Sequence, residues 1–320
     1  MFAGGLLAAP LAAEAQQARN SARVGVLSFG PSPNQQLSIV GALLVAALRE
    51  RGWIEGQNLV MERRFGETTD QLHTGAAELG KLKVDVLVVP SAGLARIAQQ
   101  EANSTSIVVA GAGDDLARIG LVASLAKPGG TITGLQILQD ELFGKRLQLL
   151  KEMRPNLSRV VFLDESVTHR VGSHARKEEA ARSRGLDLHV YIATRAEDFP
   201  AMFDDMVKKG ISGLICESTP LTFMHHPQII GLSARARILA VYSWNVYVEA
   251  GGLASYGVDR NELSRRTAVF IDKILRGAKP ADLLIEQPTK FQMVINLKTA
   301  KALGLTIPPS LLQRADQVIE

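Results

Sequence analysis

The chain alternates short apolar runs with longer segments whose apolar residues recur at helical spacing. Short runs rich in β-branched residues are typical of buried parallel strands, and apolar residues three or four positions apart are typical of one helix face. We therefore predict a repeated strand–helix order and an α/β fold. The predicted strands cover residues 23–29, 58–65, 84–89, 107–110, 131–135, 159–163, 186–192, 213–216, 238–242, 253–256 and 288–296.

The segments between the strands carry one apolar face each. Residues 36–51 place Ile39, Leu43 and Leu48 on a single face and end at Gly52, which favours a helix stop. The strand at 58–65 alternates poorly, which predicts an edge position in its sheet. The predicted helices cover residues 36–51, 71–82, 94–102, 116–125, 142–153, 172–184, 196–208, 223–235 and 260–275.

The strand–helix order runs twice, which predicts two Rossmann-like, doubly wound lobes. A length of 320 residues also exceeds a single typical core. We assign residues 23–137 to lobe one and 138–257 to lobe two, and we expect residues 258–287 to return to lobe one and 288–320 to lobe two. Hinge strands between two α/β lobes, with a cleft between the strand ends, are typical of proteins that close on a ligand.

Small residues follow the strands of lobe one, where uncovered backbone N–H groups suit an anion. Ligands of open α/β sheets sit at the carboxyl ends of strands, and a helix N-terminus there favours a carboxylate. Phe29, beside Ser28, is equally expected to line the cleft or to pack in the core. The candidates for binding a carboxylate are Ser28, Phe29, Ser91, Ala92, Gly93, Gly111, Gly113 and Asp114.

Lobe two offers acidic and aromatic residues in the matching positions. Carboxylates favour an ammonium group, and the face of a tryptophan favours an aromatic ring or a cation. Asp259 follows Gly257 at the predicted hinge and is a further candidate for the ammonium. The candidates are Asp164, Glu165, Glu217, Ser218, Thr219, Trp244 and Asp259, with Tyr242 near the same strand end.

Each candidate also has a structural interpretation. Asp164 and Asp114 could cap the helices that follow them, because acidic residues after strands often do so. Glu217 is a better binding candidate, since Ser218 or Thr219 could provide that cap instead. Trp244 could pack in the core or at the hinge.

Composition describes a globular protein without a marked preference for nucleic acid. Hydrophobic residues make up 46% of the chain and charged residues 21%, and the net charge of +4 is spread without a run of five Lys or Arg. Cys216 is the single cysteine, so an internal disulfide or a cysteine-based zinc site is excluded. We expect no nucleic-acid partner and a monomeric chain.

The first 17 residues combine an apolar stretch with a small-x-small pattern at Ala13-Glu14-Ala15. This pattern is typical of an export signal, although no Lys or Arg precedes Arg19. Either upstream residues are missing from a signal peptide, which we favour, or the segment is an apolar tail.

The sequence contains no convincing catalytic or metal-binding constellation. Gly111-Ala112-Gly113 resembles the opening of a dinucleotide fingerprint, but Leu116 stands where the third glycine is needed. His225 and His226 are adjacent and cannot share a helix face, which disfavours a metal site. Neither a Gly-x-Ser-x-Gly elbow nor a P-loop occurs. We expect no catalytic residue, metal or cofactor.

Five segments resemble the ABC-transporter substrate-binding proteins that include tryptophan- and tyrosine-binding members. They are residues 48–58 (LRERGWIEGQN), 120–134 (GLVASLAKPGGTITG), 144–150 (GKRLQLL), 249–257 (EAGGLASYG) and 279–319, which begins KPADLLIEQPTKFQMVINLK. The resemblance implies a type I periplasmic-binding-protein architecture and a periplasmic or membrane-anchored receptor that delivers a solute to a permease and an ATPase. It implies no enzymatic activity.

The loops expected to face the ligand depart from the family pattern. The chain has Ser91-Ala92-Gly93-Leu94 where such proteins usually show a Thr-Gly-Thr-Pro-type turn, and Asp164-Glu165 where they commonly show an Asn-Pro-type turn. The ligand is therefore predicted from the residues themselves, as an amine-bearing or aromatic carboxylate similar to an amino acid. The alternative is an enzyme or a ligand-sensing regulator core on the same scaffold.

Overall fold

The computed structural model describes residues 21–30, 41–137, 139–165 and 173–320, which fall into two compact units. Unit 1 comprises Met1–Gln136 with Asn261–Gln287, and unit 2 comprises Ile137–Arg260 with Pro288–Glu320. The chain therefore passes from one unit to the other at residues 136–137, 260–261 and 287–288. The predicted export signal at residues 1–17 lies outside the described residues.

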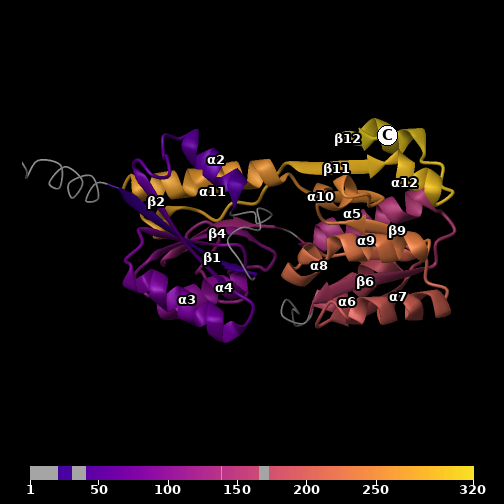
Figure 1. Cartoon of the computed structure of the whole chain (residues 1–320), viewed down its shortest axis with the longest axis horizontal. Coiled ribbons are helices and arrows are strands. Elements are labelled where there is room, and N and C mark those ends of the chain that lie inside the picture. Colours follow the sequence, from indigo (N-terminus) through magenta and orange to yellow (C-terminus); the bar gives the residue numbers. More distant parts are fainter. Residues whose placement is uncertain (1–20, 31–40, 138, 166–172) are drawn as a thin grey trace, which may run out of the picture. The chain divides into compact units, whose positions relative to one another are not determined.

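The described strands of unit 1 form a parallel sheet in the order β2-β1-β3-β4-β5 (Figure 1). The predicted edge position of residues 58–65 is confirmed, because β2 is an outer strand. The central strands β3 and β4 are almost wholly buried, which explains their continuous apolar runs. The strands are β1 (Ala22–Phe29), β2 (Leu59–Gly66), β3 (Val86–Val89), β4 (Ser106–Ala112) and β5 (Ile132–Gln136).

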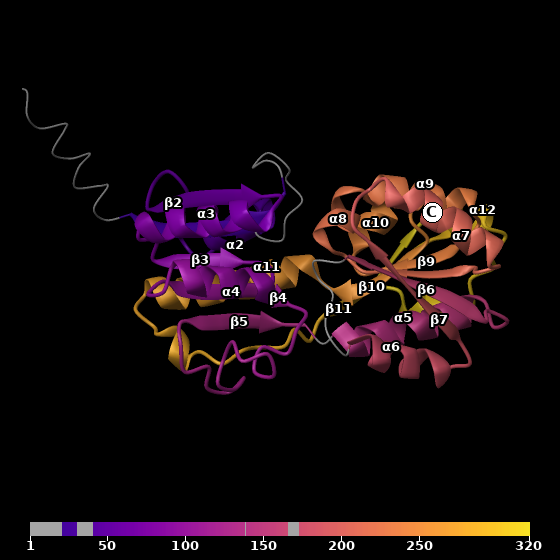
Figure 2. The same ribbon diagram turned by 90° about the horizontal axis from the view of Figure 1, so that it is seen from below.

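Helices cover both faces of this sheet. α3 (Thr69–Lys81) and α4 (Ala92–Glu101) lie on one face, and α2 (Ala42–Arg49) and α11 (Arg260–Leu275) lie on the other (Figures 1 and 2). Thr68 begins α3 with a capping box, in which its hydroxyl accepts from the Gln71 N–H and the Gln71 side chain accepts in return.

The returning segment of unit 1 runs beside the outer edge of β5. After α11, the short 3₁₀ turn η2 (Pro280–Asp282) leads to residues 283–286. Gln136 N–H donates to the Glu286 carbonyl at 2.9 Å, Glu286 N–H donates to the Gly134 carbonyl at 2.9 Å, and Thr133 Oγ1 donates to the Leu283 carbonyl at 2.8 Å. A segment distant in sequence therefore covers the last strand.

The described strands of unit 2 form a larger sheet in the order β12-β11-β10-β9-β8-β6-β7. All neighbouring pairs are parallel except β10 and β11, which are antiparallel. The strands are β6 (Arg159–Glu165), β7 (Asp187–Ala193), β8 (Gly213–Cys216), β9 (Leu239–Tyr242), β10 (Ala254–Val258), β11 (Phe291–Asn296) and β12 (Gln317–Ile319).

Two apolar clusters pack against opposite faces of this sheet. α5 (Gln139–Met153), α6 (Ser173–Arg182), α12 (Leu297–Ala302) and α13 (Pro309–Arg314) contribute to one cluster. α7 (Asp198–Lys208), α9 (His226–Arg235) and α10 (Asn245–Glu249) contribute to the other, and Figure 2 shows α5 and α6 apart from α7 and α9. Both units thus have the predicted α/β design, with helices on both faces of a mostly parallel sheet.

The predicted helix at residues 116–125 is wrong. This segment forms turns, in which Asp115 Oδ1 accepts from the N–H groups of Ala117 and Arg118 and the backbone turns at Gly120 with φ of +74°. A left-handed glycine ends a helix after a single turn. Leu121 is buried nevertheless, so the apolar pattern reported burial in the core and not a helix face.

The predicted single helix at residues 223–235 is two helices, α8 (Pro220–Met224) and α9. Pro227 lies in the first turn of α9, and a proline there cannot continue a preceding helix because it lacks an N–H donor. The short elements α10, α12, α13 and β12 were not predicted, since they are too brief to show a periodic pattern. Residues 36–40 of the predicted first helix lie outside the described part of the chain.

In the described part of the chain, every helix is too short or too polar to cross a membrane.

Candidate functional site

The carboxyl edge of the unit 1 sheet gathers the predicted residues of that unit. Because β1, β3 and β4 are parallel neighbours, the residues that end them emerge at one edge. Ser28 is buried near the end of β1, and Phe29 packs half-buried against the core. Phe29 is thus at least partly a packing residue.

Ser91, Ala92 and Gly93 begin α4 at this edge. The Ser91 hydroxyl accepts a hydrogen bond from the Leu94 N–H at 3.4 Å, so Ser91 is the N-cap of the helix. Ala92 is buried, whereas Gly93 is exposed and a Cβ there would meet no atom within 4 Å. The exposed backbone at Gly93 is the part of this turn that another molecule can approach.

Gly111 marks a bulge at the end of β4. The register with β5 shifts between Ala110 and Ala112, and Gly111 has φ of +153°, a conformation that favours glycine. Gly113 and Asp114 follow and are half-buried. Asp115 Oδ1 accepts hydrogen bonds from the N–H groups of Ala117 and Arg118 at the start of the turn that follows.

The carboxyl edge of the unit 2 sheet gathers the predicted acidic residues. Since β6, β8, β9 and β10 are parallel to one another, Asp164, Glu217, Trp244 and Asp259 emerge at one edge. Asp164 is buried on β6, and Asp259 is half-buried directly before α11. Glu165 is the last residue of β6, and its side chain lies outside the described part of the structure.

Glu217 belongs to a buried polar network that the sequence did not reveal. Arg146 of α5 donates from Nη1 to Glu217 Oε2 at 3.1 Å, and Ser243 Oγ donates to Glu217 Oε1 at 3.0 Å. Arg146 Nε also donates to the Tyr256 carbonyl at 2.8 Å. The network joins the ends of β8, β9 and β10, and the Arg146 charge offsets that of Glu217.

One feature of the amino-acid sequence indicates that a buried ion pair is present. Arg146 falls on the apolar face of the predicted helix at 142–153, among leucines. A charged residue on a core face requires a partner of opposite charge. The sequence could show that Arg146 needed a carboxylate, but the identity of Glu217 as that carboxylate depends on the packing of α5 against the sheet.

Thr219 caps the helix that follows β8, as one predicted alternative proposed. Its hydroxyl accepts from the Thr222 N–H at 3.2 Å, and Thr222 Oγ1 accepts from the Thr219 N–H at 2.9 Å. Thr222 Oγ1 also donates to the Glu217 carbonyl at 2.6 Å. Ser218 is half-buried, and its hydroxyl accepts from the Tyr247 hydroxyl at 3.4 Å.

Trp244 is part of an aromatic cluster at the same edge. Its ring centroid lies 5.4 Å from that of Phe223 in an edge-to-face arrangement, and Phe223 also contacts His226 and Tyr247. The Arg260 guanidinium lies 5.1 Å from the Trp244 ring centroid. The cation that contacts Trp244 here belongs to the chain itself, and Arg260 was not among the predicted residues.

Tyr242 and Cys216 are core residues. Both side chains are fully buried at the ends of β9 and β8, and Tyr242 stacks on Tyr247 with ring centroids 4.8 Å apart. Burial raises the pKa of the Cys216 thiol well above its ordinary value, which disfavours the reactive thiolate. The packing interpretation of this cysteine therefore fits the structure.

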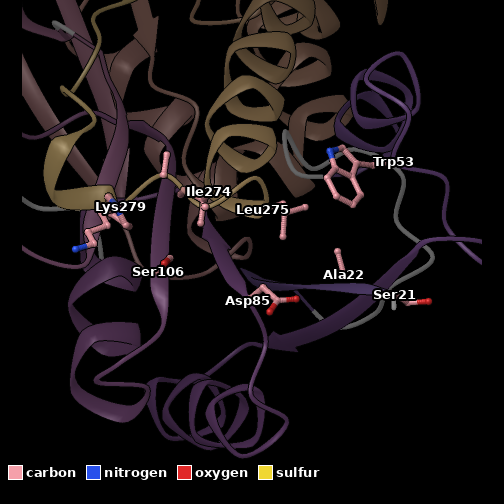
Figure 3. A pocket seen from close by; sticks show the side chains of 11 residues that line it. Ser21, Ala22, Trp53, Asp85, Ser106, Ile274, Leu275 and Lys279 are labelled. Carbon is pink, nitrogen blue, oxygen red and sulfur yellow. The ribbon is translucent and has the colours of Figure 1, made fainter. Parts of the chain in front are cut away.

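A cavity of about 550 Å³ lies in unit 1, at the edge opposite the predicted residues. Ala22 and Ser106 begin β1 and β4, and Asp85 precedes β3, so this is the amino edge of the sheet (Figure 3). Asp85 Oδ2 accepts from the Arg23 N–H at 2.7 Å, and Trp53 Nε1 donates to Asp272 Oδ1 at 2.8 Å. These polar groups are held by contacts within the fold.

Among the described residues, the structure brings together no group of three His, Cys, Asp or Glu side chains able to hold a metal ion.

Solved structures of other proteins share this fold. A conserved domain protein from Vibrio cholerae O1 biovar El Tor aligns with a TM-score of 0.84 and 24% identity, covering 93% of this chain and 99% of that one. An ABC domain from Streptococcus pneumoniae in complex with L-Trp aligns with a TM-score of 0.82 and 24% identity, covering 93% of this chain and 100% of that one. The fold is the α/β type I periplasmic-binding-protein architecture, with two mostly parallel sheets.

The chain belongs to the ABC transporter substrate binding protein family, whose model matches residues 24–319. The curated tyrosine-binding protein of Clostridioides difficile (strain R20291) is 24% identical over 267 residues, which is 82% of this chain and 75% of that protein. The family is a class of non-enzymatic binding proteins, and it confirms the resemblance predicted from sequence.

Proposed function

We propose that this chain is the receptor of an ABC importer for an amine-bearing or aromatic carboxylate similar to an amino acid. The observation that carries the proposal is the pairing of an aromatic cluster with acidic residues at one edge of the unit 2 sheet. Phe223 and Trp244 form the aromatic part, and Asp164 and Asp259 lie at the ends of strands on the same edge. Aromatic rings bind an aromatic ligand and carboxylates bind an ammonium.

The relatives support this ligand class. A curated relative is a tyrosine-binding protein, and a structural relative was solved with L-Trp. Both ligands are aromatic amino acids. The loops at Ser91 and Asp164, however, depart from the sequence pattern that is common in the family. We therefore propose the class of ligand and not tyrosine or tryptophan in particular.

The acidic residues differ in their suitability for the ammonium. Glu217 already interacts with the buried Arg146, so its net attraction for a second cation is reduced. Asp164, the penultimate residue of β6, and Asp259, directly after β10, are further proposals for that role. On unit 1, the proposed ligand contacts are the small residues at the carboxyl edge, with the exposed backbone of Gly93 foremost.

A thermal-shift screen with ligand-free protein tests the proposal. The protein is first unfolded and refolded to remove any co-purified solute. Its Tm should then rise by a large amount with at least one aromatic or amine-bearing carboxylate. Saturation at one hundred times Kd stabilises the folded state by about 2.7 kcal/mol. A rise with sugars or dicarboxylates alone would contradict the proposed ligand class.

We further propose that the receptor acts in the periplasm as a monomer and delivers its solute to a membrane permease and its ATPase. Family membership supports the transporter partners. Cell fractionation should place the mature protein outside the cytoplasm, and light scattering should give a mass close to that of one 34.5 kDa chain, less any removed signal. Retention of Met1 in a cytosolic protein would contradict the location.

A further inference from the structure

The cavity at the amino edge of the unit 1 sheet lies apart from the proposed ligand contacts of that unit. All of its lining residues belong to unit 1. Its volume of about 550 Å³ is within the range of roughly 300–1,000 Å³ that is typical of small-molecule sites. Because the candidate residues of unit 1 end its parallel strands at the opposite edge, a molecule in this cavity would occupy a second site.

The backbone donors at the start of the strands are already used. The Ala22 N–H donates to the Asn58 carbonyl at 3.0 Å, and the Asp85 N–H donates to the Arg23 carbonyl at 2.8 Å. An anion in the cavity would therefore meet N–H groups that already have acceptors. This arrangement differs from a helix N-terminus, where open N–H groups favour an anion.

Acceptors, in contrast, remain open at the cavity. Asp85 Oδ2 accepts from the Arg23 N–H at 2.7 Å, whereas Asp85 Oδ1 has no hydrogen-bond or ion-pair partner in the described part of the chain. The hydroxyl of Ser106, at the start of the adjacent strand β4, also has no partner among the described residues. The polar groups at this point can thus accept hydrogen bonds from a cation.

The C-terminus of α11 adds negative charge at the cavity. The helix ends in a Schellman motif, in which the Gly277 N–H donates to the Ile274 carbonyl and the Ala278 N–H to the Lys273 carbonyl, each at 2.9 Å. The carbonyls of Leu275 and Gly277, which both line the cavity, accept no hydrogen bond from the described residues. Open carbonyls at the end of a long helix carry partial negative charge and favour a cation.

Trp53 gives the cavity a fixed aromatic wall. Its Nε1 donates to Asp272 Oδ1 at 2.8 Å, and the same oxygen accepts from Arg276 Nε at 2.7 Å. The Arg276 Cζ atom lies 5.8 Å from the Trp53 ring centroid, so the ring is held by two neighbours. Figure 3 shows the Trp53 ring and the Leu275 side chain above the Asp85 carboxylate. The cavity therefore combines apolar surface with a negative group.

Lys279 is the cation that lines the cavity in the described part of the chain. Its side chain is exposed to solvent. Figure 3 shows it at the end of the lining that is far from Trp53, with its ammonium turned away from the other labelled side chains. Water screens an exposed ammonium, so Asp85 and the end of α11 set the charge preference of the cavity.

We propose that this cavity binds an organic cation, a molecule that joins an ammonium group to an apolar body. Asp85 Oδ1 and the open carbonyls of α11 accept hydrogen bonds from the ammonium, and Trp53 packs against the apolar body. The inference does not depend on the ligand of the proposed function, since the two sites of unit 1 lie at opposite edges of its sheet.

Fluorine NMR of protein labelled with fluorotryptophan tests the inference, because the chain contains two tryptophans. Trp53 reports the cavity, Trp244 reports the candidate residues of unit 2, and a Trp244→Phe variant assigns the two resonances. The probes are phenethylamine, phenylpropionate and phenethyl alcohol. They share a phenyl group but carry a positive charge, a negative charge and no charge at neutral pH.

Three variants accompany the titrations. Asp85→Asn removes the negative charge and keeps an oxygen that accepts from the Arg23 N–H. Ala278→Leu fills part of the cavity from its lining. Asp187→Asn is the matched control, because it removes the same charge from an exposed carboxylate of unit 2 that pairs with His189.

We expect phenethylamine to shift the Trp53 resonance in a saturable way, at concentrations about tenfold or more below those of the other two probes. Asp85→Asn should weaken this binding by about tenfold or more, because a charged hydrogen bond is lost. Ala278→Leu should weaken it as well, and Asp187→Asn should behave as wild type. Circular dichroism melts show whether each variant retains its fold.

The outcomes separate this inference from the proposed function. The inference is overturned if no probe shifts the Trp53 resonance, if phenylpropionate binds as tightly as phenethylamine, or if folded Asp85→Asn binds like wild type. If Asp85→Asn does not fold, wild-type affinity in Ala278→Leu overturns it instead. A shift of the Trp244 resonance alone would support an amine-bearing ligand at unit 2 and overturn the second site.

Discussion

Arg146 and Glu217 form an ion pair inside unit 2, with Nη1 and Oε2 3.1 Å apart and with side chains only 1% and 10% exposed. Arg146 also holds the Tyr256 carbonyl, and Glu217 also holds the Ser243 hydroxyl. The pair therefore ties together the ends of three adjacent strands at the proposed binding edge. Loss of this ion pair should lower the free energy of unfolding more than it lowers the affinity for a ligand.

Removing either charge should destabilise the protein by about 3–5 kcal/mol, because the remaining buried charge loses its partner. Arg146→Met and Glu217→Leu each remove one charge, and urea unfolding followed by circular dichroism measures the change.

The double variant Arg146→Met/Glu217→Leu separates an unpaired charge from lost packing. Its stability should exceed that of either single variant, since no buried charge remains. As a surface control, Arg182→Met should change stability by about 1 kcal/mol or less. A double variant as unstable as the sum of the single variants would show that the pair does not act through charge.

Gly257 is a second test of the same edge. A Cβ at this position would lie 1.8 Å from the Ser243 carbonyl oxygen, which is backbone and cannot move aside freely. Gly257→Ala should cost about 1–3 kcal/mol or more in chemical denaturation, as overpacking does. The control is Gly231→Ala in α9, where a Cβ meets no atom within 4 Å and helix propensity predicts a gain of about 0.5–1 kcal/mol.

Cys216 should be unreactive in the folded protein. Its side chain is fully buried, and burial raises the pKa of the thiol, so both access and thiolate formation are suppressed. A coloured disulfide reagent at pH 8 should report no thiol within minutes under native conditions and one thiol per chain in guanidinium chloride. Rapid native labelling would mean that the end of β8 opens.

Asp198 should titrate at unusually low pH. Hydrogen bonds from the Thr194 hydroxyl and backbone, and then from the Arg195 side chain, lower its pKa to about 2. Because the folded-state pKa lies below the ordinary value, its stabilising effect is present above about pH 4 and is lost as the pH falls through 2. Carboxyl NMR should place the midpoint near 2, and Thr194→Val should raise it; an ordinary midpoint in wild type would contradict the hydrogen bonds.

The fold class could be predicted because short runs rich in β-branched residues alternate with segments of helical spacing, which is typical of parallel strands joined by helices. The runs at residues 84–89 and 107–110 fall on β3 and β4. The same reasoning failed at residues 116–125, where Leu116 and Leu121 are buried from turns. Helical spacing of apolar residues shows which side chains face the core. The backbone conformation is set instead by the cap at Asp115 and by the left-handed Gly120.

The shared edge of the candidate residues could be predicted from the sequence, whereas their contacts could not. Residues that end parallel strands were expected to share an edge, and Asp164, Glu217 and Trp244 do so. Their partners could not be predicted, because Arg146 and Arg260 come from helices whose packing brings them to those residues. A sequence shows which side chains carry charge, whereas compensation of that charge depends on contacts between distant segments.

Residues 283–286 cover the outer edge of β5 and are made long after it. During synthesis, more than a hundred residues of chain separate the completion of β5 from the arrival of the segment that hydrogen-bonds to Gly134 and Gln136. Until then β5 is an open strand edge, which is a template for pairing with another chain. A polypeptide cut after β10 would keep that edge exposed. The last sixty or so residues therefore protect unit 1 against aggregation through this strand.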